Sequence, residues 1–410
     1  MLGVATPGER CRAKSLAIAG ANEPMEPSNM RILKRLSLPA ALTAATLVAA
    51  CDEQKFRATN EGHYQADDPG EGAKKTEAKA ETKEAKKEEG IKIDRSLLAQ
   101  FDKLPAAFAS PKNVPSEAKV SLGKQLYFDA RLSKNQDVSC NSCHDLAKYG
   151  VDGNPRSFGH KKQLGGRNSP TVYNAAGHFV QFWDGRATDV EAQAKGPILN
   201  PVEMAMKDDK SVVAVLNSIP EYQESFKKAF PDAKEPVSYD NLALAIGAFE
   251  RTLTTPAPFD KYLAGDEAAL NDEEKKGLAL FLSTGCTTCH TGVTVGGSMY
   301  QKLGLAKPWD RPITDTGRKA VTKQDVDNLM FKVPSLRNVA KTGPYFHDGS
   351  VATLDEAVTL MAKHQLGKEL KADEVKSLVT FLGALTGELP KITPPALPPS
   401  GPKTPKPDPT

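Results

Sequence analysis

The sequence contains few aromatic residues, a low share of hydrophobic residues and almost no net charge. Of its 410 residues, 6% are aromatic and 39% hydrophobic, with two tryptophans and 30 prolines. This hydrophobic share is low for one globular core, so we expect part of the chain to be a tail or a linker. The formal net charge of +3 gives no electrostatic case for binding nucleic acid or an anionic membrane surface.

Cysteine is also scarce, but four of the six cysteines occur in two Cys-x-x-Cys-His motifs. Two thiols at this spacing can each add to a vinyl group of a haem, and the adjacent histidine then lies beneath the iron. A disulfide redox pair or half of a zinc site would not explain the histidine that follows in both copies. The pattern therefore predicts two covalently attached c-type haems. The motifs are Cys140-Asn141-Ser142-Cys143-His144 and Cys286-Thr287-Thr288-Cys289-His290.

The N-terminal segment resembles a bacterial lipoprotein signal. A basic stretch over 31–35 precedes an alanine-rich apolar stretch over 36–50, which is too short to span a bilayer, and Cys51 follows. We expect translation to start at Met30, residues 1–50 to be an extension plus a signal peptide, and Cys51 to be lipidated. A plain secretory signal with an incidental cysteine is the alternative. Both place the mature protein outside the cytoplasm, in the periplasm. With a lipoprotein signal, the lipid on Cys51 would be its only membrane attachment.

Two further segments lie outside the region that should fold. Residues 51–94 are polar, with Lys and Glu interspersed, and carry too little apolar surface to offset their ordering entropy, which predicts a charged, disordered tether. Residues 390–410 are rich in proline and should be extended. The tether would let a lipid-anchored protein reach its partners.

Helical patterns predominate between these segments. Asn271 or Asp272 can cap a helix that leads into the second haem motif, and Thr353 begins a capping box for another helix. Apolar residues recur at helical spacing over 239–253 and 372–385. Alternating strand patterns are scarce. We therefore predict a mainly α fold in which each half is a small helical bundle around one haem.

Histidine and methionine are the residue types that could bind the distal face of each iron. His160 follows His144 at a distance that lets the intervening loop fold back over the same haem, and neighbouring glycines favour a mobile loop. A solvent-exposed loop histidine is an equally good interpretation. At the second haem Met361, His364 and His347 are all candidates, and spacing alone does not choose among them.

Five further blocks accompany the two haem motifs in a specific order. They are Phe158-Gly159-His160, Gln181-Phe182-Trp183-Asp184-Gly185-Arg186-Ala187, Asn200-Pro201-Val202-Glu203-Met204, Val333-Pro334-Ser335-Leu336-Arg337-Asn338-Val339 and Pro344-Tyr345-Phe346-His347-Asp348-Gly349. Through these blocks residues 95–390 resemble the bacterial di-haem cytochrome c peroxidases. The resemblance implies two cytochrome c-like haem domains packed against each other, a peroxidatic one over 95–255 and an electron-transfer one over 256–389.

The resemblance also implies different roles for the two haems. His144 and a displaceable His160 would bind the iron of a low-potential peroxidatic haem. His290 and Met361 would bind the iron of a high-potential haem that receives electrons.

Two residues are implied by the resemblance to act on peroxide, with Glu203 as the acid-base group and Gln193 as its companion. Peroxide must lose a proton from one oxygen and gain one on the leaving oxygen, and a single carboxyl can do both. A neutral amide can orient peroxide without adding charge. Without the resemblance, a cap for Glu203 and a surface amide for Gln193 would be the preferred interpretations.

The remaining implied residues lie between the domains. Trp183 matches a tryptophan placed between the two haems, although it could equally be interface core. One Ca²⁺ would be bound by the side-chain oxygen of Asn168 and the backbone carbonyls of Thr342 and Pro344, which are oxygen ligands that suit this ion. His347 would be a structural histidine near a haem propionate.

The resemblance implies that hydrogen peroxide is reduced to water with electrons from a small cytochrome c or cupredoxin, and that a homodimer is possible. Two alternatives are a protein-modifying di-haem oxidase and a di-haem protein that only transfers electrons. Met361 together with His160 argues against the first alternative. Glu203 and Gln193 argue against the second.

Overall fold

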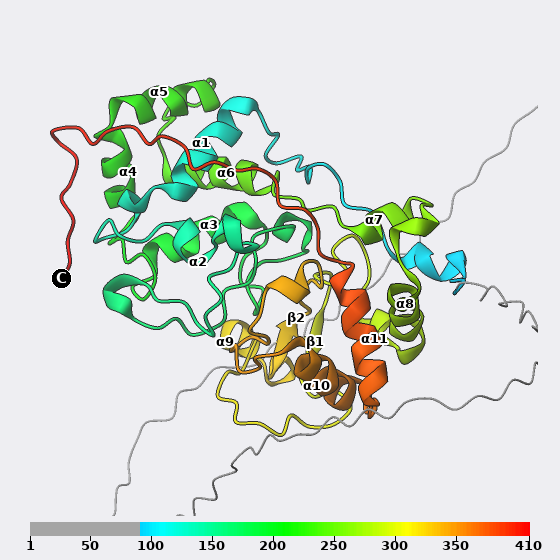
Figure 1. The fold of residues 1–410 in the computed structure, drawn as a ribbon. Coiled ribbons are helices and arrows are strands. Elements are labelled where there is room, and N and C mark those ends of the chain that lie inside the picture. Colours follow the sequence, from blue (N-terminus) through cyan, green and yellow to red (C-terminus); the bar gives the residue numbers. More distant parts are fainter. Residues whose placement is uncertain (1–90) are drawn as a thin grey trace, which may run out of the picture. The chain divides into compact units, whose positions relative to one another are not determined.

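The computed structural model describes residues 91–410, so the signal peptide, Cys51 and nearly all of the tether lie outside the described residues. Within this region helices predominate, as predicted, and the short antiparallel pair of β1 (Tyr300–Lys302) and β2 (Met330–Lys332) is the one sheet (Figure 1). The α-helices are α1 (Glu117–Phe128), α2 (Cys140–Cys143), α3 (Val190–Leu199), α4 (Asp209–Asn217), α5 (Pro220–Ala229), α6 (Tyr239–Glu250), α7 (Pro258–Leu263), α8 (Asp272–Thr284), α9 (Lys319–Thr322), α10 (Leu354–Leu366) and α11 (Ala372–Gly383).

The N-terminal half is a bundle of α1, α3, α4, α5 and α6 around one apolar core. Leu122, Leu126, Phe226 and Leu242 are almost fully buried in it. Helices α1 and α6 approach closely because position 123 is glycine: a Cβ there would lie 1.8 Å from the carbonyl oxygen of residue 245. Helix α1 also contacts α2, so this closely packed pair supports the first haem motif.

The C-terminal half packs α7, α8 and α11 around a second core, in which Phe259 and Phe281 both contact Phe381. Leu98 and Phe101 also belong to this core, although they precede the first haem motif in the sequence. The described part of the chain therefore begins against the C-terminal half, crosses to form the N-terminal half and then returns (Figure 1).

The helix starts predicted from capping patterns are confirmed. The side-chain oxygen of Asn271 accepts the backbone N–H of Glu274 at 2.9 Å, and the Glu274 carboxylate accepts the N–H of Asn271 in return. The Thr353 hydroxyl accepts the N–H of Glu356 at 3.3 Å at the start of α10. Gly285, in the left-handed region at φ 99°, ends α8 and leads directly into the second haem motif.

The proline-rich C-terminal segment contains no helix or strand, as predicted, and lies along the N-terminal half. The Ser218 and Thr404 hydroxyls are 2.8 Å apart, and Arg131 donates to the Ser400 hydroxyl at 3.2 Å. Gln136 donates its side-chain amide to the carbonyl of residue 405 at 2.8 Å. This segment thus connects the end of the C-terminal half to the surface of the N-terminal half.

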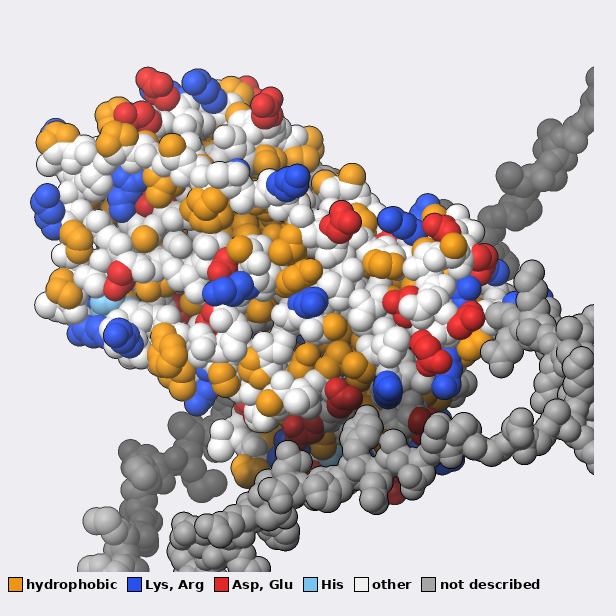
Figure 2. Space-filling model, in the orientation of Figure 1, with side chains coloured by type: hydrophobic (Ala, Val, Ile, Leu, Met, Phe, Trp, Pro, Cys, Tyr) orange, Lys and Arg blue, Asp and Glu red, His pale blue; other side chains and the backbone are white. Residues whose placement is uncertain are grey.

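The surface carries charges of both signs. Acidic and basic side chains both occur across the face drawn in Figure 2, with hydrophobic side chains between them. None of the helices over residues 91–410 has the length and apolar character that crossing a membrane requires.

Candidate haem sites

The first haem motif starts in the short helix α2 (Cys140–Cys143), whose two thiols are free and half-buried. The Ser142 hydroxyl accepts the backbone N–H of Ser139 at 3.0 Å, which fixes the start of this turn. His144 follows directly, and its carbonyl accepts a hydrogen bond from the buried Tyr127 hydroxyl at 2.6 Å. Because Tyr127 belongs to α1, the motif is attached to the main bundle of the N-terminal half.

A cavity with many polar groups surrounds this motif, and we call it the first cavity. Cys140, Cys143 and His144 line one part of it, and Gln193 from α3 and Glu203 from the following loop line another. The structure therefore brings the predicted haem attachment residues and the predicted acid-base pair to one space. Further polar residues that line it are Arg167, His178, Arg186, Glu250 and Lys332.

Glu203 is held by the turn that follows α3. The Asn200 side-chain amide donates to Glu203 Oε1 at 2.8 Å, and the Asn200 carbonyl accepts the Glu203 backbone N–H at 3.0 Å. Burial raises the pKa of the Glu203 carboxyl, while Arg186 and the Asn200 hydrogen bond oppose part of the shift. The raised pKa brings proton exchange at this carboxyl closer to neutral pH.

His160 lies in a hairpin loop closed by a bridge between Phe158 and Leu164. Its backbone N–H donates to the Glu203 carbonyl at 2.7 Å, so the loop contacts the segment that carries the acid-base candidate. The imidazole is buried, with neither ring nitrogen hydrogen-bonded, and is not among the groups lining the first cavity. Such unsatisfied buried nitrogens make this position of the ring costly.

The backbone of this loop requires a residue without a side chain at one position and left-handed φ angles at two others. A Cβ at Gly159 would lie 2.1 Å from the carbonyl oxygen of Val202, so only glycine lets the loop approach the Glu203 segment this closely. Lys161 and Lys162 both have φ 56°, in the left-handed region that disfavours residues with a side chain. The loop thus stores backbone strain beside the first cavity.

The second haem motif follows α8 as a 3₁₀ turn over Cys286–Thr288, after which Cys289 and His290 complete it. His290 Nδ1 lies 3.4 Å from the carbonyl oxygen of Val295. Both thiols and the His290 ring line a second cavity, which lies in the C-terminal half. The two motifs thus have the same sequence pattern but different local conformations.

The walls of the second cavity are mostly apolar. They include Phe281, Leu303, Phe331, Val333, Leu336, Val339, Leu354, Val358, Leu366, Leu370, Leu378 and Leu382. Of the three candidates for a distal ligand there, Met361 from α10 and His347 line the cavity, whereas His364 does not. His364 instead has its Nε2 3.1 Å from Asp310 Oδ1 and its Nδ1 3.2 Å from the Lys307 carbonyl. His364 thus makes its polar contacts outside the second cavity.

The donor groups in both cavities suit a haem c. Burial lowers the pKa of His290 to about 4 and also lowers the pKa of His144, so both imidazoles are neutral at pH 7 and have a lone pair for iron. Burial raises the pKa of Cys140 to about 12 and that of Cys286 to about 11, as expected for thiols set in apolar surroundings. Two thiols and one neutral imidazole per cavity are the groups that haem attachment needs.

Trp183 and Lys332 line both cavities. The Trp183 indole N–H donates to the Asn168 carbonyl at 3.0 Å, and the Lys332 backbone N–H donates to the Trp183 carbonyl at 2.8 Å. The indole ring also lies edge-on to His347, with ring centroids 6.5 Å apart. Trp183 therefore adjoins both cavities, and its position between two bound haems stays a prediction.

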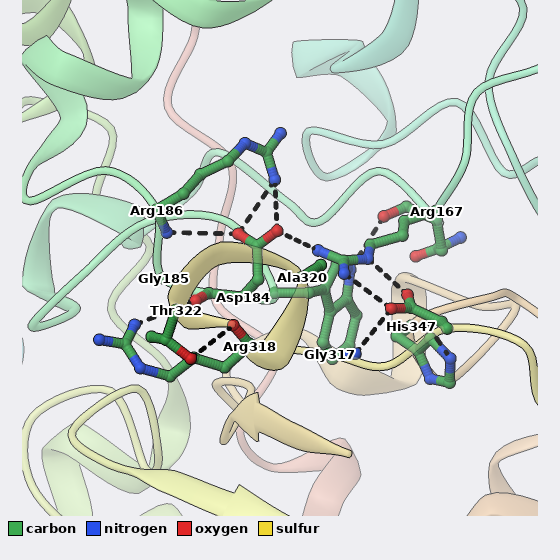
Figure 3. A network of polar contacts seen from close by, with 12 residues as sticks. Arg167, Asp184, Gly185, Arg186, Gly317, Arg318, Ala320, Thr322 and His347 are labelled. Carbon is green, nitrogen blue, oxygen red and sulfur yellow. Dashed lines mark hydrogen bonds and ion pairs between the residues drawn. The ribbon is translucent and has the colours of Figure 1, made fainter. Parts of the chain in front are cut away.

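A network of charged groups joins the two halves beside Trp183 (Figure 3). Asp184 accepts hydrogen bonds from Arg167 at 2.6 Å and from Arg186 at 3.0 Å, and it lies between these two guanidinium groups in Figure 3. Arg167 also donates to both oxygens of Asp315, at 2.6 and 2.8 Å. His347 Nε2 lies 3.9 Å from the same carboxylate. Arg167, a residue of the N-terminal half, is thereby paired with an acidic residue of the C-terminal half.

The residues expected to bind calcium lie near this network. The Asn168 backbone N–H donates to the His347 carbonyl at 2.8 Å, so Asn168 adjoins the loop that contains Thr342 and Pro344. Its side-chain amide nitrogen donates to the carbonyl of Asn154 at 3.1 Å. Calcium binding at these three residues stays a prediction.

Sequence analysis assigned no role to several residues of the cavity walls, among them Arg186, Glu250, Lys332 and His178. Arg186 occurs in a motif block, so its position in the sequence could have indicated it. Glu250 ends α6 with a side chain that faces the first cavity, and burial raises its pKa to about 8. No local pattern distinguishes Lys332 from the many surface lysines, because its burial results from long-range packing.

Comparisons with known proteins agree with this geometry. A family model described as di-haem cytochrome c peroxidase matches residues 117–268. Cytochrome c551 peroxidase of Pseudomonas aeruginosa is 49% identical over 314 residues, covering 75% of this chain and 90% of that protein. Cytochrome c551 peroxidase of Nitrosomonas europaea is 48% identical over 305 residues, covering 74% and 89%.

A solved structure of a MauG-like protein associated with microbial copper homeostasis matches with a TM-score of 0.62 at 30% identity, covering 70% of this chain and 94% of that chain. The predicted arrangement of two cytochrome c-like haem domains agrees with this likeness. At the level of identity and coverage found among the peroxidases, shared ancestry extends over both haem motifs. This chain belongs to the di-haem cytochrome c peroxidase family.

Proposed function

We propose that this protein reduces hydrogen peroxide to water in the first cavity, with electrons that enter at the second cavity from a c-type cytochrome. The family and its peroxidase members support this reaction. The observation that carries the assignment is the contrast between the cavities: the half-buried carboxyl of Glu203 and the amide of Gln193 line the cavity of His144, whereas mostly apolar side chains line the cavity of His290. A reaction that moves protons needs the first environment, and electron transfer needs only the second.

The two haems, when attached, supply iron for binding peroxide and for storing and passing electrons. Glu203 accepts a proton from one peroxide oxygen and returns it to the leaving oxygen. Its position on a turn fixed by Asn200 and its raised pKa both suit this exchange at neutral pH. Gln193 supplies a neutral amide from the adjacent α3 that can hold peroxide through hydrogen bonds.

Arg186 assists Glu203 electrostatically. Its guanidinium lies over the Phe182 ring at 3.5 Å and donates to Asp184, so the side chain is held on one side of the cavity. The positive charge stabilises the ionised form of Glu203 and so limits the rise of its pKa. The carboxyl can therefore alternate between its two protonation states.

Electrons reach the first cavity through the region of Trp183. Met361 and His290 line the second cavity together and would be the residues that hold its iron, and a thioether ligand would supply the high potential that suits accepting an electron from the donor. Trp183 lines both cavities and fills the space between them with a large conjugated side chain.

His160 would be the displaceable ligand of the first iron. In the position that the structure describes, its ring is off the cavity wall and its nitrogens have no partners, so iron coordination would satisfy one of them. The strained left-handed residues that follow it supply a loop able to adopt more than one conformation.

The finer parts of the proposal concern location and assembly. Calcium at Asn168, Thr342 and Pro344 would stabilise the loop that carries His347 and so couple the two halves. A periplasmic location suits c-type haem attachment, and lipidation at Cys51 would anchor the protein there. A cupredoxin is the alternative donor to a cytochrome, and a homodimer is the proposed assembly.

Rapid mixing of the half-reduced protein with hydrogen peroxide tests the main proposal. The absorbance of the His144 haem should change within the mixing series, and the electron stored at the His290 haem should then be consumed. The fully oxidised protein serves as the control for reductive activation. A His144 haem that stays six-coordinate and unreactive in the half-reduced protein would overturn the proposal.

A further inference from the structure

Lys332 is a buried cation without an anionic partner. Its side chain is 4% exposed, and it forms no ion pair with any carboxylate over residues 91–410. Among residues 91–410, the one hydrogen-bond partner of its ammonium is the imidazole of His178, with Nζ and Nδ1 3.3 Å apart. Burial and Lys332 lower the pKa of His178 well below its usual value, so this ring is neutral and accepts a hydrogen bond from the ammonium.

Such an ammonium is costly in a folded protein. A charge removed from water is tolerated when an opposite charge and hydrogen bonds replace its hydration, and one neutral imidazole supplies a single hydrogen bond only. The position of Lys332 therefore calls for an anion in the space that its ammonium faces. Hydrogen peroxide is neutral and cannot supply that charge.

The two cavities supply a source of the missing anion. Lys332 lines both of them, and each takes a haem that carries two propionate carboxylates in addition to the groups used for attachment. Its backbone N–H also donates to the Trp183 carbonyl at 2.8 Å, which fixes the residue beside the other side chain shared by the cavities. Lys332 thus belongs to the walls of both cavities, where carboxylates of both haems could approach its ammonium.

We propose that Lys332 is a charge partner shared by the propionates of both haems and that its positive charge raises the reduction potential of each. A nearby cation disfavours ferric iron more than ferrous iron, because the ferric form carries the additional positive charge. Loss of the ammonium would also leave the negative charge of the propionates uncompensated. That charge stabilises ferric iron, so this effect too would lower the reduction potential. This inference rests on the two attached haems and does not depend on the proposed peroxidase mechanism.

The test compares the midpoint potentials of both haems by spectroelectrochemistry of the intact holoprotein, without peroxide. Lys332→Met removes the charge and keeps an unbranched apolar stem, whereas Lys332→Arg keeps the charge. Lys302→Met, on the paired strand β1, is the matched control because Lys302 is exposed and lines neither cavity. Haem content, measured as the pyridine haemochrome, verifies that each variant carries two haems.

In Lys332→Met the equilibrium constant for reducing each haem should fall about tenfold or more. Lys332→Arg and Lys302→Met should retain both potentials. Unchanged potentials in Lys332→Met, or a fall at one haem alone, would overturn the shared role. An equal fall in Lys332→Arg would show that packing rather than charge is responsible, which would also overturn it. Failure of peroxide turnover leaves this measurement unaffected.

Discussion

The two haem cavities share one attachment motif but differ in the polarity of their walls. The first presents Glu203, Gln193 and Arg186 around its motif, and the second presents a nearly continuous apolar surface in which Met361 is a soft ligand candidate. Proton transfer needs ionisable groups that are held in place, whereas electron transfer is favoured by a site that changes little on reduction. The attachment motif therefore sets how many haems are bound, and the walls set what each can do.

The largest effect should come from replacing Glu203, the proposed acid-base group, which lines the first cavity and not the second. Glu203→Gln should lower peroxide turnover by about 10²- to 10⁴-fold while both haems remain attached. Steady-state peroxide reduction measures this effect, with Glu224→Gln on the exposed face of α5 as the control. Full activity of Glu203→Gln would remove the carboxyl from the mechanism and with it the chemical contrast between the cavities.

Replacing the thioether should make the second haem resemble the first. Met361→His should lower the equilibrium constant for reduction of the His290 haem at least about a hundredfold, roughly 0.1 V, because the methionine ligand favours the ferrous state. Redox titration followed by absorbance measures the potential. Met330→Leu is the control, since Met330 lines neither cavity. An unaltered potential in Met361→His would mean that another residue binds this iron.

The two tryptophans allow a direct test of the region between the cavities. Trp183 lines both cavities, whereas Trp309 lines neither and packs against Phe346 and His364. Trp183→Phe should slow electron transfer between the haems on the order of tenfold, since the smaller ring leaves a gap between the cavity walls. Flash photolysis of the half-reduced protein measures this rate. Equal rates in Trp183→Phe and Trp309→Phe would assign Trp183 a packing role only.

The smallest effect concerns the pH dependence of stability. Burial first, and then the neighbouring Glu191, raise the pKa of Glu250 from 4.5 to about 8. The folded-state pKa is thus above the unfolded one, so its stabilising contribution is complete below about pH 4.5 and is lost as the pH rises through 8. As the pH rises from 4.5 to 8, the wild type should therefore lose more unfolding free energy than Glu250→Gln, by about 1 to 3 kcal/mol.

Denaturant titrations of the holoprotein at several pH values measure this difference. Glu221→Gln, on the exposed surface of α5, is the matched control and should retain the wild-type dependence. The same pH dependence in Glu250→Gln and the wild type would show that ionisation of Glu250 does not lower the stability of the folded protein.

Local features of the structure followed from the sequence. The haem motifs, the cap at Asn271 and the cap at Thr353 each depend on residues within five positions of one another, so their geometry is encoded by short-range contacts. The polar segment that contains Glu203 was recognised through a motif block, although its raised pKa depends on burial.

Long-range features were decided by tertiary packing alone. Leu98 joins a core built mainly after residue 258, and Arg167 pairs with Asp315 across the two halves. Lys332 becomes a buried wall residue of both cavities although nothing around it in the sequence marks it. The sequence by itself determined which haems are attached and where the main helices begin, because covalent chemistry and capping are local. Only the tertiary structure decided which charges are buried between the haems, because desolvation depends on every segment that packs around a group.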